Sequence, residues 1–341
     1  GRRREGERDH AMTRLRLHTR ALVLLVWLLP AAVQASDARD WLARMEHAVE
    51  SLSYEGTFVH MVGNRVETMH VIHRALDGEI SERLFSRDQP GREILRQNDK
   101  VTCIFADQQT VLVEHRAGRH GAPLIGALLQ GSSEIEEWYG FAAAGDDSKL
   151  GRSARVIEIR PRDEFRYGHR LWLDQLTAIP LKVQLLDPAG VTLEQIQFVS
   201  MIIPADISDA RLQPDVSIDG FTWYEQEPAE AGSGGALAEV GWFAADPPPG
   251  FELREGRVRK LPGGDHAVEH LVYSDGLASV SLFIEPAEAM DEELFGLSRM
   301  GAAHAFTLVV DGHQVTAVGE APPRTVERLA RSARAVESAP Q

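Results

Sequence analysis

The chain has 341 residues, of which 43% are hydrophobic, and it carries a formal net charge of −15. This length fits two domains or one large domain, and the apolar content is too high for a disordered chain. The excess of acidic residues argues against a nucleic-acid partner, because phosphate binding needs a clustered cationic face.

Residues 1–35 are predicted to be upstream sequence followed by an export signal, not part of a folded domain. Arginines that follow Met12 precede an apolar run at positions 21–29, Pro30 ends the run, and small residues stand at positions 33 and 35. This pattern is typical of a secretory signal peptide, so we expect cleavage after Ala35 and a periplasmic location. A membrane anchor is the alternative, but the apolar run has only about half of the ~20 residues needed to span a bilayer.

One cysteine, Cys103, is present in the whole sequence. A single thiol cannot form an internal disulfide, even in an oxidising compartment. Because Cys103 lies in an apolar run, we expect a buried, inert side chain, with a reactive or intermolecular thiol as the alternative.

The exported part opens with a predicted helix. Ser36 or Asp37 can cap its first turn, and apolar residues recur at helical spacing at Leu42, Met45 and Val49. The period changes to two at Tyr54, which indicates that the helix ends just before that residue.

From Tyr54 to about Val199 the sequence predicts mainly β-strands. Short β-branched and aromatic runs alternate with turn pairs such as Gly63-Asn64 and Asp77-Gly78. The runs are too close together for crossover helices, so antiparallel hairpins are expected. One short helix is expected near Glu134 to Trp138. The strands, roughly ten of them, fit one large curved sheet or unclosed barrel.

A stretch rich in Gly, Ser and acids at 225–239 predicts a flexible linker. We therefore divide the chain into upstream and signal residues 1–35, a half-barrel domain 36–224, the linker 225–239 and a small domain 240–341. Glycine-punctuated strands and a terminal helix with apolar positions from Val326 to Val336 predict an α+β fold for the last part. The overall fold class is thus mainly β, with α+β character at the C-terminal end.

The segment His266 to His270 matches a zinc-protease signature, H-x-x-E-H. That chemistry needs both histidines on one face of a helix with the glutamate as base. Flanking glycines and alternating Val, Leu and Tyr instead predict a strand, on which Glu269 points away from both histidines. A metal-dependent hydrolase built on His266, Glu269 and His270 is therefore kept only as a minor alternative. We expect no catalytic residue, metal or cofactor.

His60, His70 and His73 lie on neighbouring predicted strands. A metal site would need two of them on one face together with a third ligand. Histidines on the polar face of a sheet explain them more simply.

An open sheet with an apolar concave face can hold acyl chains. The same side chains could instead form the ordinary core beneath a covering helix. The candidates for this lipid-lining face are Phe58, Met69, Val71, Ile104, Leu112 and Trp172.

Five segments together resemble the RseB/MucB family of periplasmic sigma-E regulators. In the first domain they are SYEGTFVH from Ser53, RPRDEFRYGHRLWLD from Arg160 and LEQIQF from Leu193. In the second domain they are HLVYSDGLASVSLFIE from His270 and GHQVTAVGEAPPRTVERLA from Gly312. Because both sets occur in order over the exported chain, the resemblance is specific.

The resemblance implies a lipoprotein-carrier-like half-barrel with covering helices in the first domain. It also implies a partner, the periplasmic domain of an RseA/MucA-type anti-sigma factor, which the family shields from the site-one protease until lipid or lipopolysaccharide acyl chains release it. A simple lipid or lipoprotein carrier is the second hypothesis, and self-association stays open. Candidate partner-binding residues, with turn or core roles as the alternative, are Tyr273, Asp275, Phe283, His313 and Gln314.

Overall fold

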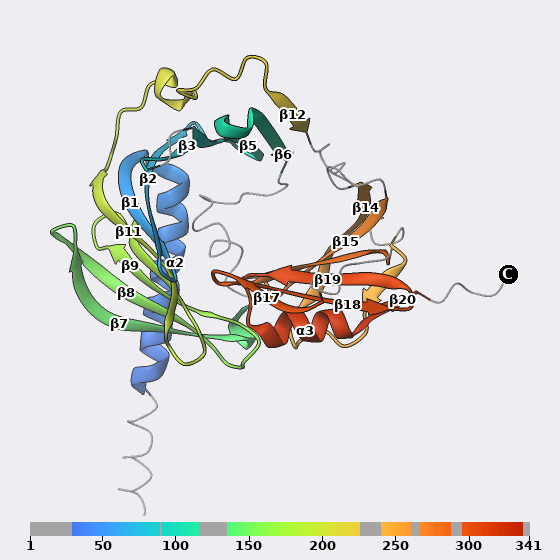
Figure 1. Ribbon diagram of the computed structural model, residues 1–341. Coiled ribbons are helices and arrows are strands. Elements are labelled where there is room, and N and C mark those ends of the chain that lie inside the picture. Colours follow the sequence, from blue (N-terminus) through green and yellow to red (C-terminus); the bar gives the residue numbers. More distant parts are fainter. Residues whose placement is uncertain are drawn as a thin grey trace, which may run out of the picture.

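The computed structural model describes residues 29–88, 91–115, 135–225, 240–260, 266–287 and 295–336. Two β-rich parts lie side by side, each with one α-helix (Figure 1). The helices are α2 (Leu29–Ser51) and α3 (Pro323–Arg331). Among the described helices, none is both long enough and apolar enough to span a bilayer.

The first part is built on a twelve-stranded sheet that does not close. Its order runs β12-β6-β5-β4-β3-β2-β1-β11-β10-β9-β8-β7, and every pairing is antiparallel except β12 with β6. The predicted unclosed antiparallel barrel is therefore confirmed. The strands are β1 (Tyr54–Val62), β2 (Arg65–Leu76), β3 (Glu79–Ser86), β4 (Arg92–Gln97), β5 (Lys100–Phe105), β6 (Thr110–His115), β7 (Tyr139–Lys149), β8 (Arg152–Pro161), β9 (Gly168–Asp174), β10 (Pro180–Leu186), β11 (Thr192–Ile202) and β12 (Thr222–Glu225).

Helix α2 lies along the concave side of this sheet (Figure 1). Its residues Leu42, Met45 and Val49 are buried in one cluster with strand residues such as Leu171. Each such side chain contributes roughly 1.5–3 kcal/mol through burial. The predicted helical start was wrong: α2 already includes Leu29, and the Asp37 carboxylate forms an ion pair with Arg155 instead of capping a first turn.

The convex side of the same sheet is covered in part by the connection between β11 and β12. Ile207 and Leu212 of this connection pack on Ile72, and Val216 packs against the cluster that contains Ile104. Where the connection crosses, the strands are buried on both faces. Alternate residues of one strand therefore belong to different apolar clusters.

The second part is a six-stranded antiparallel sheet with α3 on one face. Strand residues Leu271, Leu282 and Val315 pack with Val326 and Leu329 of the helix, which begins at Pro323 because proline fits a first helical turn. A separate two-stranded pair joins β13 to β20. The strands are β13 (Trp242–Ala244), β14 (Glu252–Lys260), β15 (Ala267–Ser274), β16 (Ser279–Pro286), β17 (Gly296–Met300), β18 (Ala303–Val310), β19 (His313–Gly319) and β20 (Ala333–Ala335).

The terminal helix is shorter than its periodicity predicted. It ends at Arg331, and Ala333 pairs with Ala244 in β20 instead of continuing the apolar face. Pairing with a distant strand thus overrides the local helical pattern. Near position 135 the predicted short helix is present as one 3-10 turn, Ile135–Glu137.

Several predictions fall outside the described residues. These are most of the linker, 226–239, and residues 1–28 of the export segment. The domain limits and the cleavage after Ala35, a position that lies inside α2, stay predictions. Cys103 is described, and its side chain is only partly buried, so the expected full burial was wrong.

Candidate functional site

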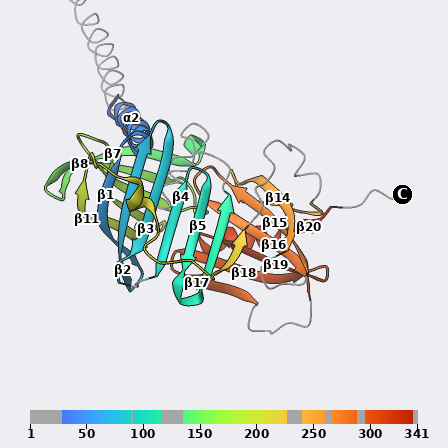
Figure 2. The ribbon, with the colours of Figure 1, turned by 90° about the horizontal axis from the view of Figure 1, so that it is seen from above.

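One cavity lies between the concave face of the first sheet and the tip of the β17–β18 hairpin of the second. Its volume is about 660 Å³, a size that suits a small ligand or part of an acyl chain. Figure 1 and Figure 2 both place the hairpin next to this concave face. The lining residues are Phe58, His60, Val62, Asn64, Arg65, Glu67, Met69, Leu84, Arg92, Ile94, Arg299, Met300 and Gly301.

The floor of the cavity is apolar and fixed by strand alternation. Phe58 and Met69 are opposite one another on β1 and β2, and Leu84 lies on β3. All three are at least 93% buried and belong to the cluster beneath α2. The Phe58 ring packs against Phe198 with 5.4 Å between ring centroids. The floor is therefore preformed by the core.

The rim of the cavity is cationic. Arg65, Arg92 and Arg299 line it and are exposed. Within the described part of the chain none of the three forms an ion pair with a carboxylate, although Glu67 also lines the cavity. An apolar floor, with rim guanidinium groups that have no carboxylate partner among the described residues, suits an amphiphile with an acyl chain and an anionic head group.

Titratable side chains cluster at one end of the cavity. His60 Nε2 lies 2.5 Å from Oε1 of Glu194 on β11. Burial lowers the pKa of the neighbouring His169 to about 4, which keeps that imidazole neutral at pH 7. Loss of hydration and the hydrogen-bonded carboxylate of Glu194 raise the pKa of Glu320 to about 7.

The structure brings together only some of the predicted lipid-lining residues. Phe58 and Met69 line the cavity, and Val71 lies in the same core. Ile104 and Trp172 belong to two other clusters, on the opposite face of the sheet, so the predicted shared face does not include them. Leu112 is half-buried on β6 and does not line the cavity.

Two of the predicted partner-binding residues are buried. Tyr273 is 3% exposed within the second core, where its hydroxyl accepts a hydrogen bond from the Ala244 amide. Asp275 is 2% exposed and forms an ion pair with the fully buried Arg166. In this conformation neither side chain can contact a partner, so their role is structural.

The other three predicted partner-binding residues are partly exposed. Phe283 stacks on His270 with 4.5 Å between ring centroids, and Gln314 donates to Glu285 on the same sheet face. His313 points to the opposite face, where it packs against Trp242. Partner binding through these three residues stays a prediction. Phe283 and Gln314 lie on the same surface of the second sheet, and His313 does not.

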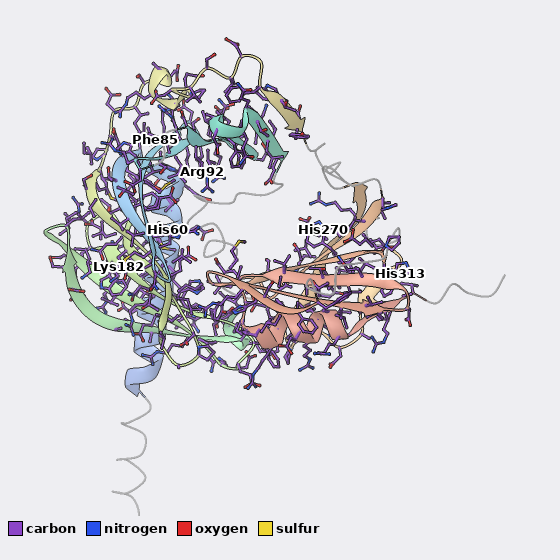
Figure 3. All side chains as sticks on the ribbon, viewed as in Figure 1. His60, Phe85, Arg92, Lys182, His270 and His313 are labelled. Atoms are coloured by element: carbon purple, nitrogen blue, oxygen red, sulfur yellow. The ribbon has the colours of Figure 1, made fainter. Side chains whose placement is uncertain are left out.

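The histidine motifs form no metal centre in the described residues. As the sequence predicted, residues 267–274 form a strand, β15, so Glu269 points away from His270. Its carboxylate accepts a hydrogen bond from the Gly241 amide. His70 and His73 pair with Glu55 and Glu82 on adjacent strands. In residues 29–88 and the other described ranges, no group of three or more His, Cys, Asp and Glu residues could hold a metal ion. Figure 3 shows His60 and His270 on different sheets.

Sequence reasoning missed the contribution of the second domain to the cavity. Arg299, Met300 and Gly301 lie more than 200 positions from Phe58 and carry no motif. Arg65 and Arg92 flank predicted turns, and their charge in an acidic chain is the only sequence signal that could have marked them. The long-range contact is set by how the domains dock, which no local pattern encodes.

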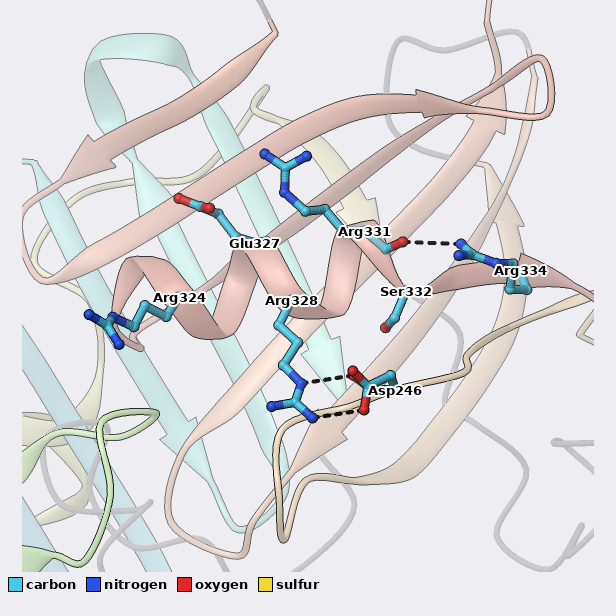
Figure 4. A pocket seen from close by; sticks show the side chains of 7 residues that line it. All are labelled: Asp246, Arg324, Glu327, Arg328, Arg331, Ser332 and Arg334. Carbon is cyan, nitrogen blue, oxygen red and sulfur yellow. Dashed lines mark hydrogen bonds and ion pairs between the residues drawn. The ribbon is translucent and has the colours of Figure 1, made fainter.

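A second hollow lies beside α3 and is lined by four arginines (Figure 4). Arg328 is paired with Asp246, and Arg334 donates to the carbonyl of Arg331 at the helix end. Arg328 and Arg331 lie in the last turn of α3, where cations stabilise a helix through its dipole. Arg324 lies in the first turn and pairs with Glu164. We therefore assign these arginines a structural role.

Comparison with known proteins gives a consistent result. The model of the MucB/RseB N-terminal domain matches residues 37–216, and that of the MucB/RseB C-terminal domain matches residues 236–334. The chain is 34% identical over 330 residues to the sigma factor AlgU regulatory protein MucB of Pseudomonas aeruginosa, covering 93% of this chain and 98% of the relative. It is 28% identical over 304 residues to the sigma-E factor regulatory protein RseB of Escherichia coli K12, covering 89% and 91%.

Solved structures agree with these matches. The complex of Pseudomonas aeruginosa MucA and MucB superposes with a TM-score of 0.70 at 32% identity, covering 89% of this chain and all of the matched chain. MucB in complex with MucA(peri) gives 0.68 at 30% identity, covering 88% and 100%. A structure described only as MucB gives 0.61 at 30% identity, covering 88% and 98%. This chain thus superposes better on the two complexes than on that third structure.

Proposed function

Because the chain belongs to the MucB/RseB family, we propose that it is a periplasmic negative regulator of a sigma-E-type envelope-stress response. It binds the periplasmic domain of a MucA/RseA-type anti-sigma factor and shields that domain from site-one proteolysis. Loss of the shield lets the anti-sigma factor be degraded and frees the sigma factor.

The observation that carries this proposal is the match of both domains, in order, to MucB structures solved with MucA. The match extends over most of the chain. A binding protein of this kind works by covering a partner, so it needs no catalytic group. We therefore propose that the protein is not an enzyme.

The cavity supports a second element of the proposal, release by lipid. Phe58, Met69 and Leu84 provide an apolar floor for an acyl chain, and Arg65 and Arg92 provide cations for a phosphate or carboxylate head group. If lipid and the anti-sigma factor favour different conformations, lipid must weaken partner binding as much as the partner weakens lipid binding. The lipid of lipopolysaccharide is the proposed natural ligand.

A protection assay tests the shielding role. The periplasmic domain of the anti-sigma factor from the same organism is incubated with the site-one protease, alone or with this protein. We expect cleavage to slow at least ~10-fold at saturating regulator. A factor of ten corresponds to about 1.4 kcal/mol of binding free energy that favours the shielded anti-sigma domain over the unshielded one. An Asp311→Asn variant, changed in an exposed turn, serves as a matched control and should protect equally well. Equal cleavage with and without the regulator would contradict the shielding role.

A further inference from the structure

The loop between β8 and β9, residues 162–167, holds the two domains together. Four consecutive residues each contact a different point of the second domain. Glu164 pairs with Arg324, and the Phe165 carbonyl accepts the Thr325 hydroxyl at 2.6 Å. This loop belongs to one of the segments that carry the family resemblance, yet none of its residues lines the cavity.

The next two residues of the loop reach two different tips of the second sheet. Arg166 forms an ion pair with Asp275 in the β15–β16 turn, with 3.1 Å between Nη1 and Oδ2 and both side chains fully buried. Tyr167 donates its hydroxyl to the carbonyl of Ala302, 3.3 Å away, in the turn at the tip of the β17–β18 hairpin. The same loop therefore holds both the β15–β16 turn and the tip of the β17–β18 hairpin.

The tip of that hairpin closes the cavity of the first sheet. Arg299, Met300 and Gly301 line the cavity, and Met300 is 80% exposed. A Cβ atom placed on Gly301 would lie 2.5 Å from Cγ1 and 3.9 Å from Cβ of Val62 on β1. The hairpin thus touches the strand that carries Phe58, and nothing bulky fits between them while the domains keep this arrangement.

We propose that the β17–β18 hairpin is a lid on the lipid cavity and that the 162–167 loop is the joint on which the lid closes. An acyl chain that enters the cavity has to move the hairpin away from β1. Because the hairpin is part of the six-stranded sheet of the second domain, and the joint ties that sheet to the first domain, this movement changes the angle between the domains. The inference rests on the proposed function and specifies how its lipid site is regulated.

In this proposal the anti-sigma partner and the acyl chain exclude each other because they bind different arrangements of the two domains. They do not compete for the same residues. The partner binds the arrangement in which the lid is closed, and the acyl chain binds the one in which it is open. Each ligand then shifts the same two-state equilibrium in opposite directions. A clamp that prevents lid opening should therefore abolish the effect of lipid and leave the partner site intact.

A disulfide provides that clamp. Val62→Cys with Gly301→Cys places two Cβ atoms about 3.9 Å apart, within the range that a disulfide spans. Cys103→Ser removes the native thiol from this variant and from its parent. Gly301 has a φ of 67°, so the variant carries some backbone strain, and its reduced form is the matched control.

The probe is undecanoic acid labelled with a dansyl group, followed by fluorescence. We expect the oxidised form to bind it at least ~10-fold more weakly than the reduced form of the same variant, with recovery on reduction. Equal affinity of the oxidised and reduced forms would overturn the lid. Anti-sigma binding is titrated separately, without lipid. A failure of the proposed function would appear as a loss of anti-sigma binding, whereas the lid is tested by probe binding alone.

Thr325→Val supplies a test that needs no engineered bond. It removes only the hydroxyl that bonds to the Phe165 carbonyl, and it lies outside the cavity. Losing one hydrogen bond from the joint should speed probe entry roughly two- to tenfold. An unchanged entry rate would mean that the loop does not control the lid.

Discussion

Replacing Asp275 with alanine is expected to lower the free energy of unfolding by about 3–5 kcal/mol. The carboxylate has a buried ion pair with Arg166, accepts the Tyr139 hydroxyl at 2.9 Å, and accepts the amides of Leu277 and Ala278 in its own turn. Removing it leaves the buried Arg166 guanidinium with Asp163 as its remaining carboxylate partner and leaves the two turn amides without their acceptor. Urea denaturation, followed by tryptophan fluorescence, measures the loss.

Two further variants separate the causes. Asp275→Asn keeps an oxygen for the turn amides but removes the charge, so it should recover only part of the loss. Glu252→Ala breaks an exposed ion pair with Arg254 and should change the free energy of unfolding by less than about 1 kcal/mol. An Asp275→Ala protein as stable as the Glu252→Ala protein would refute the structural role assigned to the buried pair.

Phe58→Ala is expected to cost about 3–5 kcal/mol of stability. The side chain is 1% exposed and packs on Phe198 and Met69, so its removal leaves a void in the core beneath α2. The same residue forms part of the cavity floor. Thermal and urea unfolding give the stability, and fluorescence of the dansyl-labelled fatty acid gives the ligand affinity.

The controls for Phe58 are chosen by burial and volume. Val66→Ala on β2 removes an apolar side chain that is 58% exposed and should cost less than about 1 kcal/mol. Phe58→Leu leaves a smaller void and should fall between the two. If Phe58→Ala and Val66→Ala lost the same stability, Phe58 could not be the core residue described above.

Local sequence patterns predicted most of the elements, and they placed two residues of the cavity floor, Phe58 and Met69, on one face of the sheet. Alternation of apolar residues on β1 and β2 placed Phe58 and Met69 on one face, and the helical spacing of Leu42, Met45 and Val49 placed a helix against them. These features depend on periods of two and 3.6 residues, which are visible in a single chain. The antiparallel pairing followed from the absence of crossover segments between strands.

The errors arose where distant segments decide the environment. Ile104 and Trp172 are apolar strand residues, but their strands are buried on both faces, so hydrophobicity alone could not tell the concave face from the convex one. Asp275 precedes a glycine in a turn, which usually indicates an exposed position. Here the turn is inserted against the other domain, and Arg166 supplies the partner charge.

The role of the hairpin was also invisible in the sequence. Met300 and Gly301 lie in a short segment without periodicity, and their place over the cavity depends on the docking of two domains. That docking depends in turn on the 162–167 loop. The resemblance marked the loop as characteristic of the family, but its contacts came only from the structure.

The most direct test of the central claim is calorimetry of residues 36–341 against the periplasmic domain of the anti-sigma factor from the same organism. We predict saturable binding with a dissociation constant of about 1 μM or tighter, a free energy near −8 kcal/mol. Lipid A added beforehand should weaken the binding. An absence of binding heat at several temperatures, with both proteins folded, would contradict the claim that this protein regulates the response by holding the anti-sigma factor.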